Sequence, residues 1–385
     1  GKTTLLRCLN FLERPDTGVI KVNGETMWDA ADPATQRESE VRKKRLHFGL
    51  VFQNFNLFPQ YTALQNVMLA GELLAKERPD YKANKKAIHA QLEQQAKELL
   101  AQMGLSERAG HYPHQLSGGQ QQRVAIARTL APEPSVLFMD EPLSNLDAKL
   151  RLEMRYELQR LHVETGSTFV YVTHDQMEAM TLATKICLIE NGVLQQYDAP
   201  LTVYNRPNNL FVADFVGNPS INFVEAKGTQ REDGALELTV FQDRKVLFRP
   251  AAPLDLGGWF QKRDRAAAEK DAALKAKSAE KTYVEKSNKD EIFRYHIAKV
   301  VEDDYSLQEE PVLTNEDFVL GIRPEAIDIV ESGHLDGEIY GAMPTGMEST
   351  IKVRVDDFLL TGVIFGSSLF TIGEKVPVTV SGDNI

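Results

Sequence analysis

The stretch Leu116-Ser-Gly-Gly-Gln-Gln-Gln-Arg-Val-Ala-Ile-Ala-Arg128 runs from a glycine-containing turn directly into a strongly helical and mostly apolar segment. It predicts that Gly118 and Gly119 turn the backbone with positive φ. The Ser117 hydroxyl and the free N–H groups of the following helix would then face outward, where the helix dipole favours an anion. Ser-Gly-Gly also occurs in ordinary loops, so the rest of the chain decides whether that anion is a phosphate.

Three other stretches are predicted to be buried strands with a polar group at the carboxyl end. They are residues 46–52 followed by Gln53, 136–139 followed by Asp140 and Glu141, and 169–173 followed by His174. Nearly continuous apolar runs suit parallel strands that are covered on both faces. Ligands of such sheets lie at the carboxyl ends of the strands, so these four side chains are expected to line one crevice.

The chain opens with Gly1-Lys-Thr-Thr4. This is the last half of the phosphate-binding pattern G-x-x-x-x-G-K-[ST], in which the lysine reaches the β/γ-phosphates and the hydroxyl binds Mg²⁺. The opening residues therefore predict a nucleotide phosphate site beside the same crevice.

Together these motifs resemble the nucleotide-binding subunits of ABC transporters, and they occur in the order typical of that family. The resemblance assigns Walker A to residues 1–4, the Q-loop to Gln53, the signature to 116–120, Walker B to 137–141, the D-loop to 144–147 and the switch to 173–175. It implies an α/β fold: a RecA-like P-loop ATPase core with a helical subdomain at about 60–118, followed by a β-rich OB-like regulatory domain.

The resemblance also implies roles for individual residues. Glu141 would orient and deprotonate the attacking water, with His174 and Gln53 as the other catalytic residues. Thr3, Gln53 and Asp140 would hold Mg²⁺, partly through water. ATP binding is implied for Gly1, Lys2, Thr3, Thr4, Ser117, Gly118, Gly119, Gln120 and Asp147. Because the helical subdomain carries the signature away from its own P-loop, Ser117 would complete the ATP site of a second subunit.

The first half of Walker A would precede Gly1, so the chain resembles one that is truncated at the N-terminus within its own motif. About half of the N–H groups that form the phosphate nest would then lie upstream. We therefore expect the 385-residue chain by itself to be a poor ATPase, with Lys2 hanging from a free terminus.

Local patterns predict the intervening elements. Apolar stripes at residues 88, 92, 96, 99 and 103, and at 150, 154, 158 and 161, predict one buried face on each of two helices. Residues 19–22 followed by Asn23-Gly24 predict a strand and a tight turn, and residues 185–190 and 193–197 on either side of Asn191-Gly192 predict a β-hairpin. The helical stripes are interpreted as core packing.

The second half of the chain has a different sequence pattern, which predicts mainly strands. Residues 204–217 resemble the linker of carbohydrate importers of the maltose-transporter type, which predicts domains at 1–217 and 218–385. Alternating residues at 236–240, 351–355 and 376–380 predict strands, and Gly321–Asp328 resembles the hallmark of the regulatory domain. Residues 262–290, rich in Ala, Lys and Glu, predict a charged helical insertion that is solvated or, as an alternative, binds a partner.

Composition limits the classes of function. A length of 385 residues suggests two or three domains, and a net charge of −11 argues against nucleic acid as the main partner. No signal peptide or membrane span is visible in the sequence, so transport would require separate membrane subunits. Cys8 and Cys187 have no metal or redox spacing and are expected to be reduced core thiols of a cytoplasmic protein.

The resemblance implies an ATP- and Mg²⁺-dependent ATPase that powers solute import, with carbohydrate as the favoured solute. Polyamines or inorganic anions are alternatives, and an ABC-type ATPase acting on DNA or ribosomes is a third class. The implied partners are a second ATPase subunit in a homodimer, two transmembrane permease subunits and, indirectly, an extracytoplasmic solute-binding protein. The implied location is peripheral, at the cytoplasmic face of a prokaryotic plasma membrane.

Overall fold

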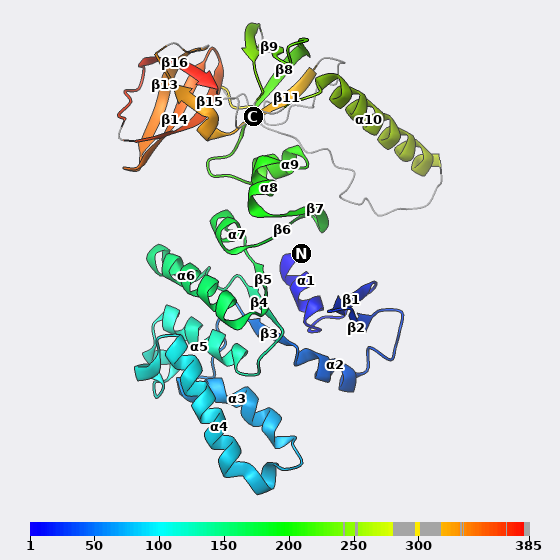
Figure 1. Cartoon of the computed structure of the whole chain (residues 1–385), viewed down its shortest axis with the longest axis vertical. Coiled ribbons are helices and arrows are strands. Elements are labelled where there is room, and N and C mark those ends of the chain that lie inside the picture. The colour runs from blue at the N-terminus through cyan, green and yellow to red at the C-terminus, as the bar shows by residue number, and fades with distance from the viewer. Residues whose placement is uncertain are drawn as a thin grey trace. The chain divides into compact units, whose positions relative to one another are not determined.

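The computed structural model describes residues 1–380 except 242, 251–252, 280–296, 301–316, 332, 334 and 367. By their contacts the residues form two compact units, 1–184 and 185–385, which are considered separately (Figure 1). Residues 185–217, which the sequence assigns to the first domain, group with the second unit. The functional boundary after residue 217 stays a prediction.

The centre of the first unit is a parallel sheet of three strands in the order β3-β4-β5. The strands are β3 (Phe48–Val51), β4 (Val136–Asp140) and β5 (Thr168–Val172). The register pairs Phe48 with Val136, and Val136 with Thr168, so the three carboxyl ends lie at one edge. The predicted parallel strands are confirmed, but β5 is only partly buried because it is the last strand of this sheet.

Helices cover the two faces of this sheet, and the alternation of side chains along β4 shows which face is which. Leu137 and Met139 pack in the core cluster formed with α5 (Gly118–Leu130) and α6 (Ala148–Thr165). Phe138 points to the other face, where its ring stacks on Phe48. That face also carries Phe11, just beyond the end of α1 (Lys2–Leu9). Helices α1 and α5 therefore cover opposite faces.

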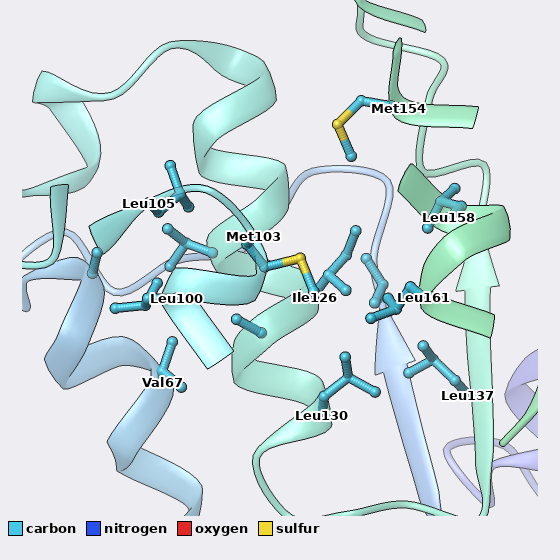
Figure 2. Packing of buried hydrophobic residues seen from close by; sticks show 14 of the residues in the cluster. Val67, Leu100, Met103, Leu105, Ile126, Leu130, Leu137, Met154, Leu158 and Leu161 are labelled. Carbon is cyan, nitrogen blue, oxygen red and sulfur yellow. The ribbon is translucent and has the colours of Figure 1, made fainter. Parts of the chain in front are cut away.

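The predicted helical subdomain is built from α3 (Ala63–Lys76) and α4 (Tyr81–Gln102), followed by the short helical turns η1 (Ser106–Arg108) and η2 (Pro113–Gln115). The predicted stripe along α4 is confirmed, since Ile88, Ala96 and Met103 are buried. Figure 2 shows the side chains of α4 meeting those of α5, with α6 on the far side of α5. This shared core fixes the position of α5.

The remaining elements of the first unit are β1 (Val19–Val22), β2 (Glu25–Asp29), α2 (Glu38–Arg45) and α7 (Gln176–Leu182). Strand β1 and the tight turn after it are as predicted, and β2 pairs with β1 beyond that turn. Asn23 and Gly24 both have positive φ at this turn, as the Asn-Gly pair requires.

The second unit begins with the predicted hairpin, β6 (Ile186–Glu190) and β7 (Val193–Asp198), followed by α8 (Pro200–Asn205) and α9 (Leu210–Phe215). Leu188 of β6 is buried, whereas its neighbour Cys187 is exposed. The prediction that both cysteines lie in the core is therefore wrong for Cys187, because successive residues of a strand face opposite sides. Cys8 is partly buried.

The rest of the second unit is β-rich, as predicted, and contains two antiparallel sheets that share one apolar core. The four-stranded sheet has the order β10-β9-β8-β11, and the five-stranded sheet has the order β12-β16-β13-β14-β15. Their elements are β8 (Asn222–Gln230), β9 (Leu236–Val240), β10 (Arg244–Phe248), β11 (Asp317–Ile322), η4 (Pro324–Ala326), β12 (Ile327–Ile329), β13 (Leu335–Pro344), β14 (Glu348–Val355), β15 (Phe358–Phe365) and β16 (Lys375–Val380).

Helix α10 (Leu256–Ala279) lies where the charged helical insertion is predicted. It begins earlier than residue 262, because Leu256 anchors it in the apolar core of the sheets. Residues 280–290 of the predicted insertion lie outside the described residues.

Arg323 joins the hallmark stretch of the β-rich part to helices α8 and α9. Its side chain is buried, and its Nη atoms donate to the carbonyl oxygens of Ala213 (3.1 Å), Val216 and Tyr204 (2.6 Å). The guanidinium carbon lies 4.0 Å from the centroid of the Tyr204 ring. Gly217, at φ +126°, would bring a Cβ within 3.0 Å of Arg323 Nη1 if it were another residue. The buried Arg323 guanidinium thus fixes the ends of helices α8 and α9.

We expect Arg323→Leu to lower the free energy of unfolding of the second unit by about 3 kcal/mol, because three carbonyl oxygens lose a charged donor. Urea denaturation followed by Trp259 fluorescence in a Trp28→Phe background measures this, since these are the two tryptophans of the chain. Arg244→Leu is the matched control, because Arg244 pairs with Asp356 on the surface. Equal losses in the two variants would contradict the role given to Arg323.

Candidate functional site

The carboxyl edge of the parallel sheet brings together residues that are far apart in the sequence. Strand β4 ends at Asp140 and is followed by Glu141, and β5 ends at Val172 and is followed by Thr173 and His174. The N-terminus of α1 reaches the same edge, where Thr3 Oγ1 donates to Asp140 Oδ1 at 3.1 Å. The structure therefore places the Walker A hydroxyl against the Walker B carboxylate.

Lys2 is the first residue of α1, and its Nζ donates to the carbonyl oxygen of Thr173 at 2.6 Å. The expectation that this side chain hangs from a free terminus is therefore wrong. The ammonium is held between α1 and the loop after β5, because that carbonyl oxygen lies beyond the end of the strand ladder and accepts the charged donor. Gly1 and Thr4 lie beside it and are exposed.

Glu141 faces His174 across this edge. His174 Nδ1 lies 3.1 Å from Glu141 Oε2, and the Glu141 side chain is 25% exposed against 69% for His174. Glu141 has φ +47°, a conformation that side-chain-bearing residues rarely adopt. Its N–H donates to Val172 O at 2.9 Å, and its carbonyl oxygen accepts from Ser144 Oγ at 2.8 Å. The backbone around the candidate base is thus strained and held on both sides.

Gln53 lies two residues beyond β3, with its side chain directed toward the D-loop. Its Nε2 donates to Ser144 Oγ at 3.3 Å, and its carbonyl oxygen accepts from Asn145 Nδ2 at 3.2 Å. The side-chain amide of Gln53 thus contacts the loop that follows Glu141 rather than the Thr3–Asp140 pair. Its predicted roles toward Mg²⁺ and water stay predictions.

The signature turn differs from its expected geometry. Gly118 and Gly119 are the first two residues of α5 and lack positive φ, so the predicted left-handed turn is wrong. Close packing explains the second glycine, because a Cβ at Gly119 would lie 2.6 Å from a methyl carbon of Leu150. Ser117 caps the helix: its Oγ accepts from Gln120 N–H, and Gln120 Oε1 accepts from Ser117 N–H at 2.9 Å.

Asp147 performs the same local task for α6, where its Oδ1 accepts from Leu150 N–H at 3.0 Å. The ATP-binding roles predicted for Ser117, Gly118, Gly119, Gln120 and Asp147 stay predictions. Ser117 Oγ takes up the Gln120 N–H, whereas Gly118 at the first position of α5 is exposed, as anion binding at a helix N-terminus requires.

Sequence reasoning missed a polar network beneath His174. Asp175 caps α7 and lies 3.1 Å from Arg155 and 3.5 Å from Arg151, both on α6. Glu178 is buried and accepts from Tyr171 Oη at 2.9 Å and from Thr173 Oγ1 at 2.7 Å. Burial, helped by the Glu178 charge, raises the pKa of Tyr171 well above its usual range, so the phenol remains a donor.

Four residues of this network, Arg151, Thr173, Asp175 and Glu178, line a pocket of about 320 Å³ together with Glu141, Ser144 and His174. One sequence signal for the network is the alternation of Tyr171 and Thr173, which places both polar groups on the same side of the chain. The predicted stripe on α6 described only the apolar face of that helix, so it gave no indication of the roles of Arg151 and Arg155.

Arg128, near the end of α5, was also missed. Its guanidinium donates to the carbonyl oxygens of Phe55 (2.9 Å) and Asn56 (2.6 Å), and lies 5.9 Å from the ring centroid of Phe58. Burial lowers its pKa, although a guanidinium remains charged at neutral pH. Arg128 therefore fixes the loop that begins at Gln53. The sequence feature that could have identified it is a cation at the end of an otherwise apolar helical run.

The oxygen atoms of Thr3 and Asp140 suit Mg²⁺, which binds hard oxygen donors and keeps several waters. No three His, Cys, Asp or Glu side chains within the described part of the chain lie close enough to form a metal site by themselves. A hydroxyl and a carboxylate completed by water and phosphate oxygens are nevertheless sufficient for this ion, so the residues present fit it.

Such a site, at the carboxyl edge of a parallel sheet and beside a helix N-terminus, defines a P-loop nucleotide-binding protein. A family model described as ABC transporter matches residues 1–144. The xylose/arabinose import ATP-binding protein XacJ of Haloferax volcanii is 32% identical over 400 residues, which cover the whole of this chain and 82% of that protein. The chain therefore belongs to the ABC transporter family.

Two further relatives match a little over three fifths of the chain. The trehalose/maltose import ATP-binding protein MalK of Thermococcus litoralis is 40% identical over 63% of this chain and 60% of its own length. The spermidine/putrescine import ATP-binding protein PotA 1 of Pseudomonas aeruginosa is 44% identical over 62% of this chain and 59% of its own length. These matches span about three fifths of each relative. The predicted resemblance to import ATP-binding proteins and the α/β fold class are confirmed.

Among the described residues, no helix combines the length and the apolar character needed to cross a membrane.

We expect Asp175→Asn to lower the free energy of unfolding of the first unit by about 2 kcal/mol, because two half-buried arginines lose their counter-charge. Asparagine keeps the helix cap, so the change isolates the charge. Urea denaturation followed by Trp28 fluorescence in a Trp259→Phe background gives the value.

Asp80→Asn is the control for this variant, because Asp80 pairs with Arg78 at 3.0 Å on the surface of the same unit. It should change stability little. A loss in Asp175→Asn no larger than in this control would show that the network beneath His174 is not stabilised by its charges.

Proposed function

We propose that the protein is the ATP-hydrolysing subunit of an importer. The observation that carries this proposal is the pairing of Thr3 with Asp140 at 3.1 Å beside the pairing of Glu141 with His174 at 3.1 Å, on one sheet edge. The first pair suits a metal-bound phosphate, and the second suits the activation of water. Membership of the ABC transporter family supports the same assignment.

The roles follow from where each group lies. The Lys2 ammonium exchanges the Thr173 carbonyl oxygen for the β/γ-phosphates, and the N-terminus of α1 adds its N–H groups. Thr3 and Asp140 hold Mg²⁺, which neutralises charge on the phosphates when it is bound. Glu141 accepts the proton of the attacking water, and His174 Nδ1 orients that carboxylate.

A second copy of the chain supplies the signature in this proposal. Lys2 and Thr3 begin α1, whereas Ser117 caps α5, and these helices cover opposite faces of the sheet. The exposed Ser117 and Gly118 are therefore available to a nucleotide held by another copy. Membrane permease subunits and an extracytoplasmic solute-binding protein complete the importer, which places this subunit at the cytoplasmic face of the membrane. Residues 218–385 serve regulation or dimer contact.

The favoured solute is a carbohydrate. Two of the relatives are named for sugars, and one of them matches the whole chain, including the β-rich second unit. The relative named for spermidine and putrescine matches only 62% of the chain. A role on DNA or ribosomes is disfavoured by the net charge of −11.

We expect Glu141→Gln to lower ATP turnover by at least about 100-fold while ATP still binds. The amide cannot accept the proton, whereas the phosphate contacts of Lys2 and Thr3 persist. Turnover and equilibrium binding of ATP are measured in parallel.

Glu153→Gln on the exposed side of α6 is the control and should match the wild type. Turnover of Glu141→Gln within about twofold of wild type would exclude Glu141 as the base.

The solute is tested with the assembled importer in lipid vesicles. We expect maltose, trehalose or a pentose sugar, supplied with the solute-binding protein, to stimulate ATP hydrolysis, because hydrolysis is coupled to an occupied transporter. Spermidine should have no effect. Stimulation by spermidine and by none of the sugars would replace the carbohydrate assignment with the polyamine one.

A further inference from the structure

Gln122 lies in the middle of α5 with no exposed surface. Its neighbours along the helix, Val124 to Ala127, are buried apolar residues. The amide Nε2 donates to the carbonyl oxygen of Pro142 at 2.7 Å. Its Oε1 is also buried, and no donor in the described part of the chain reaches it. The amide is thus only half satisfied.

Stability alone does not account for a glutamine here. A buried acceptor without a partner costs free energy, and one neutral hydrogen bond recovers only part of the cost of burying an amide. An unbranched apolar side chain such as methionine fills a similar space without the unpaired oxygen. The specific contribution of Gln122 is therefore its bond to Pro142.

Pro142 directly follows Glu141, and this junction is strained. Glu141 has φ +47°, which is unfavourable for a residue with a side chain. A following proline restricts it further, since residues before proline favour extended backbone. Such a conformation persists only where the surroundings enforce it.

Three contacts enforce this conformation. Val172 of β5 accepts from the Glu141 N–H, and Ser144 of the same loop donates to the Glu141 carbonyl oxygen. The third contact, from Gln122, comes from α5 and holds the next peptide along the chain. Helix α5 is itself fixed in the largest apolar core of the unit, so it provides a rigid support.

We propose that Gln122 is a positioning residue for Glu141: it holds the Pro142 carbonyl so that the strained Glu141 presents its carboxylate to His174 and to the water. The proposal rests on the proposed ATPase function. Helix α5 then has two positioning roles, because its Arg128 also fixes the loop that begins at Gln53.

The test compares Gln122→Met with Gln95→Met in the natural protein. Gln95 is the matched control, because it is a partly buried helical glutamine whose Nε2 donates to a backbone carbonyl oxygen, that of Ala131, away from the sheet edge. Four quantities are measured: kcat, KM for ATP, the midpoint of thermal unfolding, and amide hydrogen exchange at Glu141 and Ser144.

We expect kcat of Gln122→Met to fall by about 10- to 100-fold, as for a displaced catalytic group, with KM unchanged. The unfolding midpoint of Gln122→Met should stay within about 4 °C of the wild-type value. The variant loses the unpaired Gln122 Oε1, but the Pro142 carbonyl oxygen becomes unpaired in its place. Amide exchange at Glu141 should accelerate. Gln95→Met should match the wild type in kcat, KM and exchange.

A Gln122→Met protein with wild-type kcat, or with unchanged exchange at Glu141, would overturn the inference. A parallel fall of kcat, ATP affinity and unfolding midpoint would also overturn it, because that is the result of a merely structural role. Gln122→Leu repeats the comparison if the methionine variant does not fold. A wild type that binds but does not hydrolyse ATP contradicts the proposed function instead, and hydrogen exchange then still tests the positioning by Gln122.

Discussion

The parallel hydrogen-bonded ladder that joins β4 to β3 and β5 is the constraint on which the first unit depends. Parallel pairing places the carboxyl ends of all three strands at one edge, so residues separated by about a hundred positions become neighbours. It also requires apolar cover on both faces. Helix α1 supplies that cover on one face and helices α5 and α6 on the other, and the N-terminus of α1 then reaches Asp140.

Helix α5, which has thirteen residues, contributes to the core, to the signature and to the two loops at the sheet edge. Its apolar face fills the core, its N-terminus presents the signature, and two of its polar side chains, Gln122 and Arg128, bind backbone carbonyl oxygens in the loops after β4 and β3. Both loops lack regular structure, so side-chain donors replace the backbone partners that a helix or sheet would supply to these carbonyl oxygens. Helix α5 thereby helps to set the geometry of the carboxyl edge of the sheet.

Features with a local cause could be predicted from the sequence. The Asn-Gly hairpins depend on two adjacent residues with positive φ, and the three parallel strands depend on short apolar runs. Gly119 shows the limit of such reasoning, because a glycine serves equally for a turn or for close packing, and only the position of Leu150 distinguishes the two. The contacts of Gln122, Arg128, Asp175 and Arg323 join distant parts of the chain through side chains, which no local pattern specifies. Cys187 was misplaced because a short alternating hairpin exposes one of its sides.

In the proposed ATP site, Thr3, Asp140, Glu141 and His174 form one half, and Ser117 of a second copy forms the other. The most direct measurement is a crystal structure of the natural protein with Mg²⁺ and a non-hydrolysable ATP analogue. We expect Lys2 Nζ to leave the Thr173 carbonyl oxygen for the phosphates, Thr3 and Asp140 to face the metal, and Ser117 to contact the nucleotide bound by the other copy. A nucleotide bound away from Thr3 and Asp140, or Ser117 contacting the nucleotide of its own chain, would contradict it.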